Sequence, residues 1–256
     1  MSRPRGRTTG LSRGRRLVID FLHFCSPDTT VAVERRVNLA ELVAARAVAD
    51  PRPGWFSVLL KAFGLASRVA PELRTSLLTF PYARLYEHAE STALVTVERQ
   101  LDGGPVVLTY PLRRPEAKSL VEIDSELGRL RTVPLGEVRA FRTALALLRL
   151  PRPVRRGLMW LALCTRGGWR DRYCGTFCAS NVVPLGGALT FALSPHTMFF
   201  GPAPVEANGD TVLRVFFDHR ATDGAPVARA LVAVEQALRG PVLDELRALG
   251  TLRAVG

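Results

Sequence analysis

The chain has 256 residues and a formal net charge of +12, and arginine supplies 33 of its 35 basic side chains. Its 47% hydrophobic and 23% charged residues are typical of a globular protein, which excludes disorder over most of the chain and a disulfide-stapled miniprotein. No apolar run approaches the roughly 20 residues of a membrane helix, and the arginine-rich start lacks the pattern of a secretory signal. Four irregularly spaced cysteines favour a reducing cytoplasm as the location.

The positive charge is concentrated in two segments. Residues 1–16 hold six arginines and no acidic residue, and residues 137–172 hold nine arginines and two acidic residues, so the other 204 residues carry a net charge of −1. We expect a disordered basic arm at 1–12, followed by one domain at 13–256. Single-stranded nucleic acids stack on aromatic side chains within basic grooves, and the arm has no aromatic residue, so we predict no nucleic-acid partner.

The first half of the domain contains several regular patterns. Alternating apolar residues over 29–37 predict a half-buried strand. Asn38 with Glu41 three residues later predicts a helix that begins with a capping box. A second helix is predicted from about Trp55 to Val69, and Pro71 should end it.

The middle of the chain predicts a hairpin and a capped helix. Residues 92–100 and 105–113 have the pattern of strands, with a glycine-containing turn between them. Ser119 and Glu122 form a capping-box pair that opens a helix with four apolar residues on one face, Leu120, Ile123, Leu127 and Leu130. Because strands and helices are mixed without a regular βαβ order, we predict an α+β fold rather than a doubly wound sheet.

His219 has the most informative setting of the four histidines. It stands at the end of a strand predicted over 212–217 and before a helix predicted from Gly224. Histidine exchanges a proton near neutral pH, so a histidine on a rigid strand end suits a general base. The spacing alone also fits a simpler interpretation, in which Asp223 caps the helix and His219 is a hydrogen-bonded surface residue.

The segment from Phe217 to Ala225 resembles the active-site signature of the dihydrolipoyl acyltransferases, the catalytic cores of 2-oxoacid dehydrogenase complexes and relatives of chloramphenicol acetyltransferase. The segment from Gly175 to Asn181 resembles the Gly-Thr-Phe-Thr-Ile-Ser-Asn segment of this family. Further matches follow in the same order, at Arg15-Arg16, at Leu60 to Phe63 with Pro71 to Arg74, and at Lys118 to Leu120. The resemblance implies a chloramphenicol acetyltransferase-like two-layer sandwich, with a mixed sheet and packed helices.

The resemblance also implies roles for particular residues. His219 would be the general base, and Ser180 would donate a hydrogen bond to the oxyanion of the tetrahedral intermediate. Asp223 would hold the loop through an ionic contact, with Arg15 or Arg16 as its expected partner. An acyl thioester of coenzyme A or of a carrier would be the substrate, in a channel between the subunits of a homotrimer or a multiple of three. No metal and no covalently bound cofactor are expected, and the residues that would bind coenzyme A are not assigned.

Two departures from the family pattern affect the expected function. The glycine that normally follows the Ser-Asn-Leu segment is absent after Asn181, and 39 positions separate Ser180 from His219, fewer than is usual in the lipoyl enzymes. We also expect no lipoyl-bearing region before the catalytic segment. We therefore expect a stand-alone acyltransferase that acts on a thiol, hydroxyl or amine acceptor, or alternatively a non-catalytic trimeric scaffold with the same fold.

Within the basic segment 137–172, the stretch from Pro153 to Arg170 has three interpretations. It could meet anionic lipid as an interfacial amphipathic element, or it could form a basic collar for the phosphates of coenzyme A. We favour the third, in which its helices pack their apolar face on the core or on a neighbouring subunit, because the apolar run at 158–164 is short. Contact with a membrane surface is therefore the less favoured interpretation.

Overall fold

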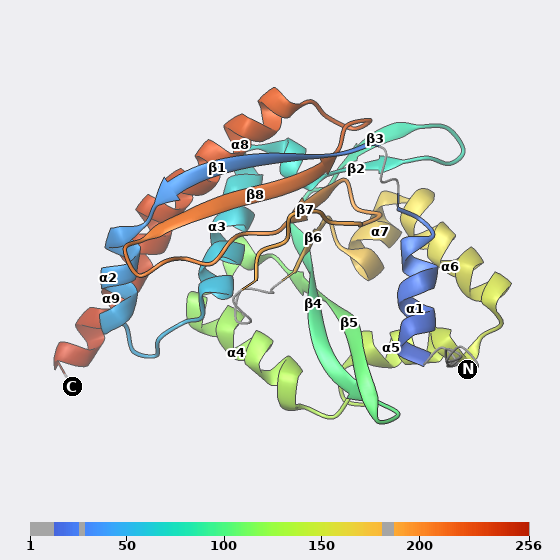
Figure 1. Ribbon diagram of the computed structural model, residues 1–256, viewed down its shortest axis with the longest axis horizontal. Helices are drawn as coiled ribbons and strands as arrows, with labels where there is room; N and C mark the ends of the chain where they lie inside the picture. The colour runs from blue at the N-terminus through green and yellow to red at the C-terminus, as the bar shows by residue number, and fades with distance from the viewer. Residues whose placement is uncertain (1–12, 26–28, 181–186, 256) are drawn as a thin grey trace, which may run out of the picture.

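The computed structural model describes residues 13–25, 29–180 and 187–255 (Figure 1). A six-stranded mixed sheet has the order β1-β8-β7-β6-β4-β5, and β2 pairs with β3 in a second, two-stranded sheet. The strands are β1 Thr30–Asn38, β2 Thr75–Leu78, β3 Arg84–Glu87, β4 Thr92–Leu101, β5 Gly104–Arg113, β6 Phe177–Ala179, β7 Met198–Phe200 and β8 Asp210–Asp218. The arm predicted at 1–12 lies outside the described residues.

Helices surround this sheet in two groups. They are α1 Arg13–Leu22, α2 Ala40–Val48, α3 Trp55–Val69, α4 Leu120–Thr132, α5 Arg139–Arg149, α6 Arg152–Cys164, α7 Gly167–Cys174, α8 Gly224–Ala237 and α9 Leu243–Val255. In Figure 1, α2, α3, α8 and α9 lie on the side of β1 and β8, whereas α1, α5, α6 and α7 lie near the β4–β5 hairpin. Helix α4 lies between the two groups, in contact with α3 and β4. The α+β class predicted from the sequence is confirmed. No helix in the described ranges is long and apolar enough to cross a membrane.

The main core lies between one face of the six-stranded sheet and the helices α3 and α8. Every second residue of β4 faces this core, namely Ala93, Val95 and Val97. The ring of Phe63 on α3 packs on Phe177 of β6 and on Phe200 of β7, with ring centroids 4.5 and 4.6 Å apart. These aromatic contacts anchor the two short central strands, each of which has only three residues.

The capping box predicted at the start of α4 is confirmed. The Glu122 backbone N–H donates to the Ser119 hydroxyl at 3.2 Å, and the Ser119 backbone N–H donates to the Glu122 carboxylate at 2.7 Å. The helix predicted at Trp55 to Val69 and the hairpin predicted at 92–113 are also confirmed. These elements depend on residues close together in the sequence, which explains why the sequence pattern predicts them.

The capping box predicted at Asn38 is wrong. Asn38 is the last residue of β1, and α2 begins two residues later without a side-chain capping bond from Leu39. The side-chain oxygen of Asn38 accepts from the Ala40 backbone N–H at 3.1 Å, and its side-chain amide donates to the Asp210 carboxylate at 2.7 Å, across the β1–β8 pair. Pairing between the strands therefore decides the orientation of this side chain.

A buried carboxylate fastens α1 to α6. The Asp20 side chain is 2% exposed and accepts hydrogen bonds from Arg155 Nε at 2.6 Å and from Arg156 Nε at 2.9 Å. Burial alone would raise the pKa of Asp20, but hydrogen bonds and charge from these two arginines hold that pKa below its usual value. Asp20 therefore stays ionised and ties the first helix to the basic segment.

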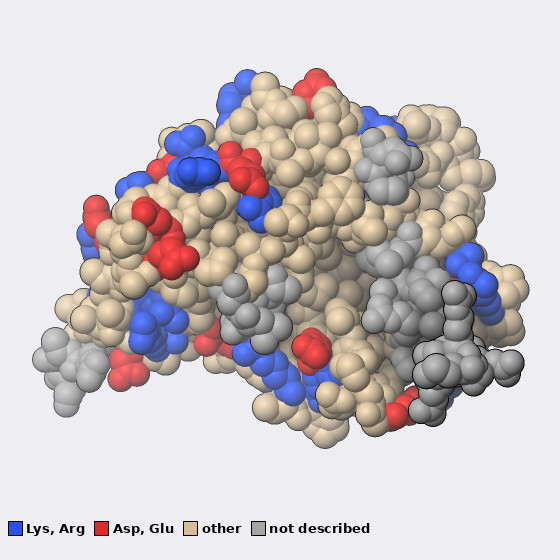
Figure 2. All heavy atoms as spheres, viewed as in Figure 1, with Lys and Arg blue, Asp and Glu red and all other residues tan. Residues whose placement is uncertain are grey.

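The basic segment 137–172 folds into α5, α6 and α7. Helix α5 packs on the main core through Phe141, which is fully buried there. In α6, within the stretch predicted to pack on the core or on a neighbouring subunit, Leu163 is buried, whereas Leu158 and Leu161 are exposed. Arg155 and Arg170 are buried. Part of the positive charge of this segment therefore forms hydrogen bonds inside the protein, to Asp20 and to the Leu163 carbonyl oxygen. Over the face that carries β1, α2 and α9, Figure 2 shows acidic and basic side chains interspersed, and ion pairs such as Arg35 with Glu235 join them.

Candidate active site

His219 extends the sheet by one residue beyond β8. Its backbone N–H donates to the Thr29 carbonyl oxygen at 2.8 Å, and its ring packs beside Phe217 with the centroids 5.5 Å apart. Its Nδ1 lies 3.6 Å from Oδ1 of Asp223, and half of its side chain is exposed. That distance exceeds a normal hydrogen bond, so the carboxylate acts through its charge when the ring is protonated. The ring is thus held on a rigid backbone and is open to a substrate.

The turn behind His219 is held by Asp218 rather than by Asp223. The Asp218 carboxylate accepts from the Arg220 backbone N–H at 3.0 Å and from its guanidinium at 2.6 Å. Burial would raise the pKa of Asp218, but the bonds from Arg220 lower it. Asp223 is the N-cap residue of α8, makes no side-chain capping bond and is 81% exposed. Its pairing with Arg15 or Arg16 stays a prediction.

Ser180 follows β6 directly. Its Oγ accepts a hydrogen bond from Oγ1 of Thr96 on β4, at 3.0 Å, which leaves the Ser180 hydroxyl proton to be donated elsewhere, as an oxyanion donor requires. No motif in the sequence singled out Thr96, since a threonine within a strand has no special signature. Cys178, two residues earlier, is buried, and burial raises the pKa of its thiol to about 12. It is therefore an inert structural thiol, as is typical of a buried cysteine.

Ser180 and His219 lie at opposite ends of the sheet. Met198 of β7 pairs with Phe217, and Phe199 pairs with Cys178. Continuing this register past the strand ends places His219 level with Gly175, with the β7 strand between them. Gly175 precedes Ser180 by five residues, so His219 lies roughly 16 Å from Ser180 along the strand direction. The two side chains also differ in face, because His219 packs beside Phe217 of the main core, whereas Ser180 meets Thr96 on the other face. A single copy therefore does not bring the predicted base and the predicted oxyanion donor together.

A buried polar group lies near the His219 end of the sheet. His196 Nε2 donates to the Cys174 carbonyl oxygen at 2.6 Å, and the Arg170 guanidinium donates to the carbonyl oxygens of Leu163 and Pro195, both at 2.7 Å. Burial, reinforced by the charge of Arg170, lowers the pKa of His196 to about 3. His196, which the sequence left without a role, is thus a neutral structural histidine.

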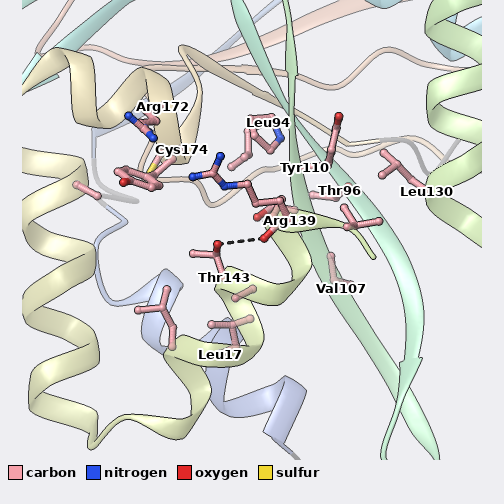
Figure 3. A pocket seen from close by; sticks show the side chains of 18 of the residues that line it. Leu17, Leu94, Thr96, Val107, Tyr110, Leu130, Arg139, Thr143, Arg172 and Cys174 are labelled. Atoms are coloured by element: carbon pink, nitrogen blue, oxygen red, sulfur yellow. Dashed lines mark hydrogen bonds between the residues drawn. The ribbon is translucent and has the colours of Figure 1, made fainter. Parts of the chain in front are cut away.

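A cavity of about 1770 Å³ lies against the β4–β5 hairpin (Figure 3). Leu94 and Thr96 of β4 line it on the face opposite the main core, and side chains of α1, α5, α6 and α7 complete its wall. Around the edge of β5 the cavity continues to α4. Because Thr96 also bonds to Ser180, the cavity reaches the neighbourhood of the predicted oxyanion donor.

Comparison with known proteins locates this fold. No family model matches the sequence, and no curated protein matches it. The structure superposes on a probable dihydrolipoamide acetyltransferase from Listeria monocytogenes with a TM-score of 0.64 and 15% identity, over 91% of this chain and 94% of that one. The chain has the fold of a dihydrolipoamide acetyltransferase core. The resemblance predicted from the sequence is thus confirmed at the level of the fold.

Two further structures agree with this assignment. The truncated catalytic core of the 2-oxoacid dehydrogenase multienzyme complex from Thermoplasma acidophilum gives a TM-score of 0.64 at 17% identity, over 92% of this chain and 99% of that one. The dihydrolipoamide acetyltransferase of Azotobacter vinelandii gives 0.63 at 18% identity, over 96% and 94%. That structure was determined to investigate a serine, a histidine and an asparagine in the catalytic mechanism.

Proposed function

We propose that this protein is an acyltransferase, which moves an acyl group from a thioester of coenzyme A or a carrier to a thiol, hydroxyl or amine. The observation that carries the proposal is the half-exposed ring of His219, held at a strand end beside the Asp223 carboxylate in an acyltransferase-core fold. The asparagine studied in the A. vinelandii protein follows the studied histidine by four residues. Asp223 follows His219 by the same interval.

The proposed chemistry uses the side chains of His219, Asp223 and Ser180. His219 takes the proton from the attacking thiol, hydroxyl or amine, and the Asp223 carboxylate stabilises the resulting imidazolium. The attacking atom adds to the thioester carbonyl, and the Ser180 hydroxyl donates a hydrogen bond to the oxyanion. The C–S bond of the donor then breaks, and the departing thiolate takes the proton back from His219. Because Asp223 is 81% exposed, its charge is screened and its effect should be small beside that of His219.

Two copies of the chain are needed to complete such a site. The opposite ends and faces occupied by Ser180 and His219 support a site that takes the base from one copy and the oxyanion donor from the next. A head-to-tail contact of this kind forms a closed ring when the rotation between copies closes. We therefore propose a trimer or a multiple of three, in keeping with the cubic core of the pyruvate dehydrogenase complex, on which the chain superposes with a TM-score of 0.61.

Formation of coenzyme A and S-acetyldihydrolipoamide from acetyl-coenzyme A and dihydrolipoamide, with the products separated by chromatography, tests this function. His219→Ala should lose about 10²- to 10⁴-fold in rate as general-base catalysis disappears, and Ser180→Ala should lose about 10²- to 10³-fold. His23→Ala is the matched control, because His23 is exposed and is part of no predicted site. A His219→Ala protein that turns over as fast as the wild type would overturn the proposal.

Mixing the two inactive variants tests the shared site. If base and donor come from different copies, oligomers reassembled from His219→Ala and Ser180→Ala chains contain some sites with both groups intact and regain part of the rate. A mixture that stays inactive after verified subunit exchange contradicts the shared site. A wild-type trimer that releases no thiol from any of a panel of acyl donors supports the alternative, a non-catalytic scaffold.

A further inference from the structure

The cavity beside the β4–β5 hairpin is larger than a site for a small acyl group requires. Its volume is about 1770 Å³, whereas pockets for drug-sized ligands measure roughly 300–1,000 Å³. Helix α5, whose 11 residues extend for about 16 Å, forms one wall along its length. The space is therefore long as well as large.

The wall of the cavity is apolar where α5, α6 and α7 cover it. Helix α5 presents Ala140, Ala144 and Leu147 to the cavity, while Ala146 is exposed and does not line it. Several large apolar side chains of the lining are left open to solvent, with 36–53% of their surface exposed: Leu158, Leu161, Trp169, Tyr173 and Leu193. Apolar surface gathered in this way indicates an apolar ligand, because covering it removes that surface from water.

Positive charge stands beside this apolar wall. The Arg139 side chain extends across the cavity towards Cys174 in Figure 3, and Arg172 also lines the space. Within the described residues, neither arginine forms an ion pair, and Arg172 instead lies over the ring of Tyr173 at 5.7 Å. The lining holds five basic side chains, Arg113, Lys118, Arg129, Arg139 and Arg172, and four acidic ones, Glu98, Glu126, Glu137 and Asp171. Of these acids, Glu126 and Asp171 already accept bonds from Tyr110 and Thr92, respectively, each at 2.6 Å. An amphiphile with one anionic group and a long apolar chain fits this arrangement.

The cavity is also continuous with the predicted reaction centre. Thr96 lines it and donates to the hydroxyl of Ser180. A carbonyl carbon beside Ser180 would therefore leave its alkyl chain directed into the space under α5 and α6.

We propose that this cavity binds the alkyl chain of a long-chain acyl group, and that α5 and α6 make the protein specific for long-chain acyl substrates. The assignment of the thioester as donor rests on the proposed function, whereas binding of the chain itself does not require any chemistry. Segments of a second copy and residues 1–12 are the competing occupants.

A chain-length series measured by calorimetry tests the proposal. With acetyl-, octanoyl- and dodecanoyl-coenzyme A, the affinity should rise by up to about fourfold for each methylene that enters the cavity. Dodecanoate alone should bind more tightly than octanoate. An affinity that does not depend on chain length overturns the proposal.

Two tryptophan variants of α5 locate the binding. Thr143 is exposed, lines the cavity and points into it in Figure 3, whereas Ala146 of the same helix is exposed and does not line the cavity. Thr143→Trp should weaken dodecanoate binding at least tenfold, and Ala146→Trp should leave it unchanged, with both variants melting at the wild-type temperature. Equal affinity in the two variants overturns the proposal, as does a Thr143→Trp protein that changes its oligomeric mass and still binds dodecanoate normally.

The same measurements separate this proposal from the proposed function. Dodecanoate binding that Thr143→Trp abolishes, in a protein that transfers no acyl group, supports the cavity assignment and refutes the acyltransferase. Turnover of acetyl-coenzyme A, together with a binding affinity that does not depend on chain length, supports the acyltransferase and refutes the cavity assignment.

Discussion

Replacing Asp20 by alanine should loosen α1 from α6. The Asp20 carboxylate is 2% exposed and faces three arginines of α6: Arg152, Arg155 and Arg156. The substitution removes the carboxylate with which all three arginines pair and leaves the three positive charges in place. Both helices also line the large cavity, so the change should affect binding of the acyl chain as well as stability.

The size of the effect follows from the burial of each arginine. Arg155 is 7% exposed, and removing the partner of such a buried charge costs about 3–5 kcal/mol of stability. The contact of Arg152 at 3.5 Å adds little, because that side chain is 63% exposed and exposed pairs contribute about 0–1 kcal/mol. At about 2–4 °C per kcal/mol for a chain of this size, the melting temperature should fall by about 6–20 °C.

Urea denaturation followed by tryptophan fluorescence measures the change. Arg13→Ala is the control, since the Arg13–Asp102 pair is exposed on both sides with 3.5 Å between its atoms and should contribute less than about 1 kcal/mol. Adding Arg155→Met to Asp20→Ala should restore part of the loss, because the buried cation is then gone. If Asp20→Ala lowers the free energy of unfolding by less than about 1 kcal/mol, the Asp20–Arg155 pair does not act as a buried ion pair, because that is the most an exposed pair contributes.

The pH dependence of the free energy of unfolding gives a second test of the contribution of Asp20. The pKa of Asp20 is lower in the folded protein than its usual value of 3.8, so the unfolded chain binds the proton first as the pH falls. The contribution of Asp20 is therefore complete above its unfolded pKa and disappears as the pH falls through the folded pKa. The stability difference between wild type and Asp20→Ala should narrow below about pH 4, and a difference that stays constant to pH 2 would contradict the ionised state.

Two further predictions concern stability. Ser119→Ala removes the side-chain acceptor for the Glu122 N–H at the start of α4 and should lower the free energy of unfolding by about 1 kcal/mol, measured in urea; no change would show that the cap contributes nothing. Burial lowers the pKa of His196 to about 3 and that of His88 to about 4, so the unfolded state binds more protons below its ordinary histidine pKa, and stability should decline from about pH 6.5 downwards. A free energy of unfolding that is flat between pH 7 and pH 4.5 would contradict this, and His88→Gln should reduce the slope.

The sequence by itself determined the elements whose signals are local. Ser119 and Glu122 stand three residues apart, and Pro71 follows the last apolar turn of α3, so the start of α4 and the end of α3 could be predicted. The setting of His219 between β8 and α8 was also predictable, because it needs only a strand, a turn and a helix in succession. Periodicity and capping act over a few residues, and a single sequence records them directly.

Tertiary structure alone decided the contacts that join distant residues. Thr96 meets Ser180 across 84 positions, and Arg155 meets Asp20 across 135. The capping box predicted at Asn38 does not form for the same reason, since Asn38 pairs within β1 and its side-chain amide bonds to Asp210, 172 positions away. The separation of Ser180 from His219 by strand register, and the cavity under α5 and α6, likewise depend on which strands pair and which faces meet. Burial and strand pairing are properties of the assembled sheet, and residue spacing along the chain does not specify them.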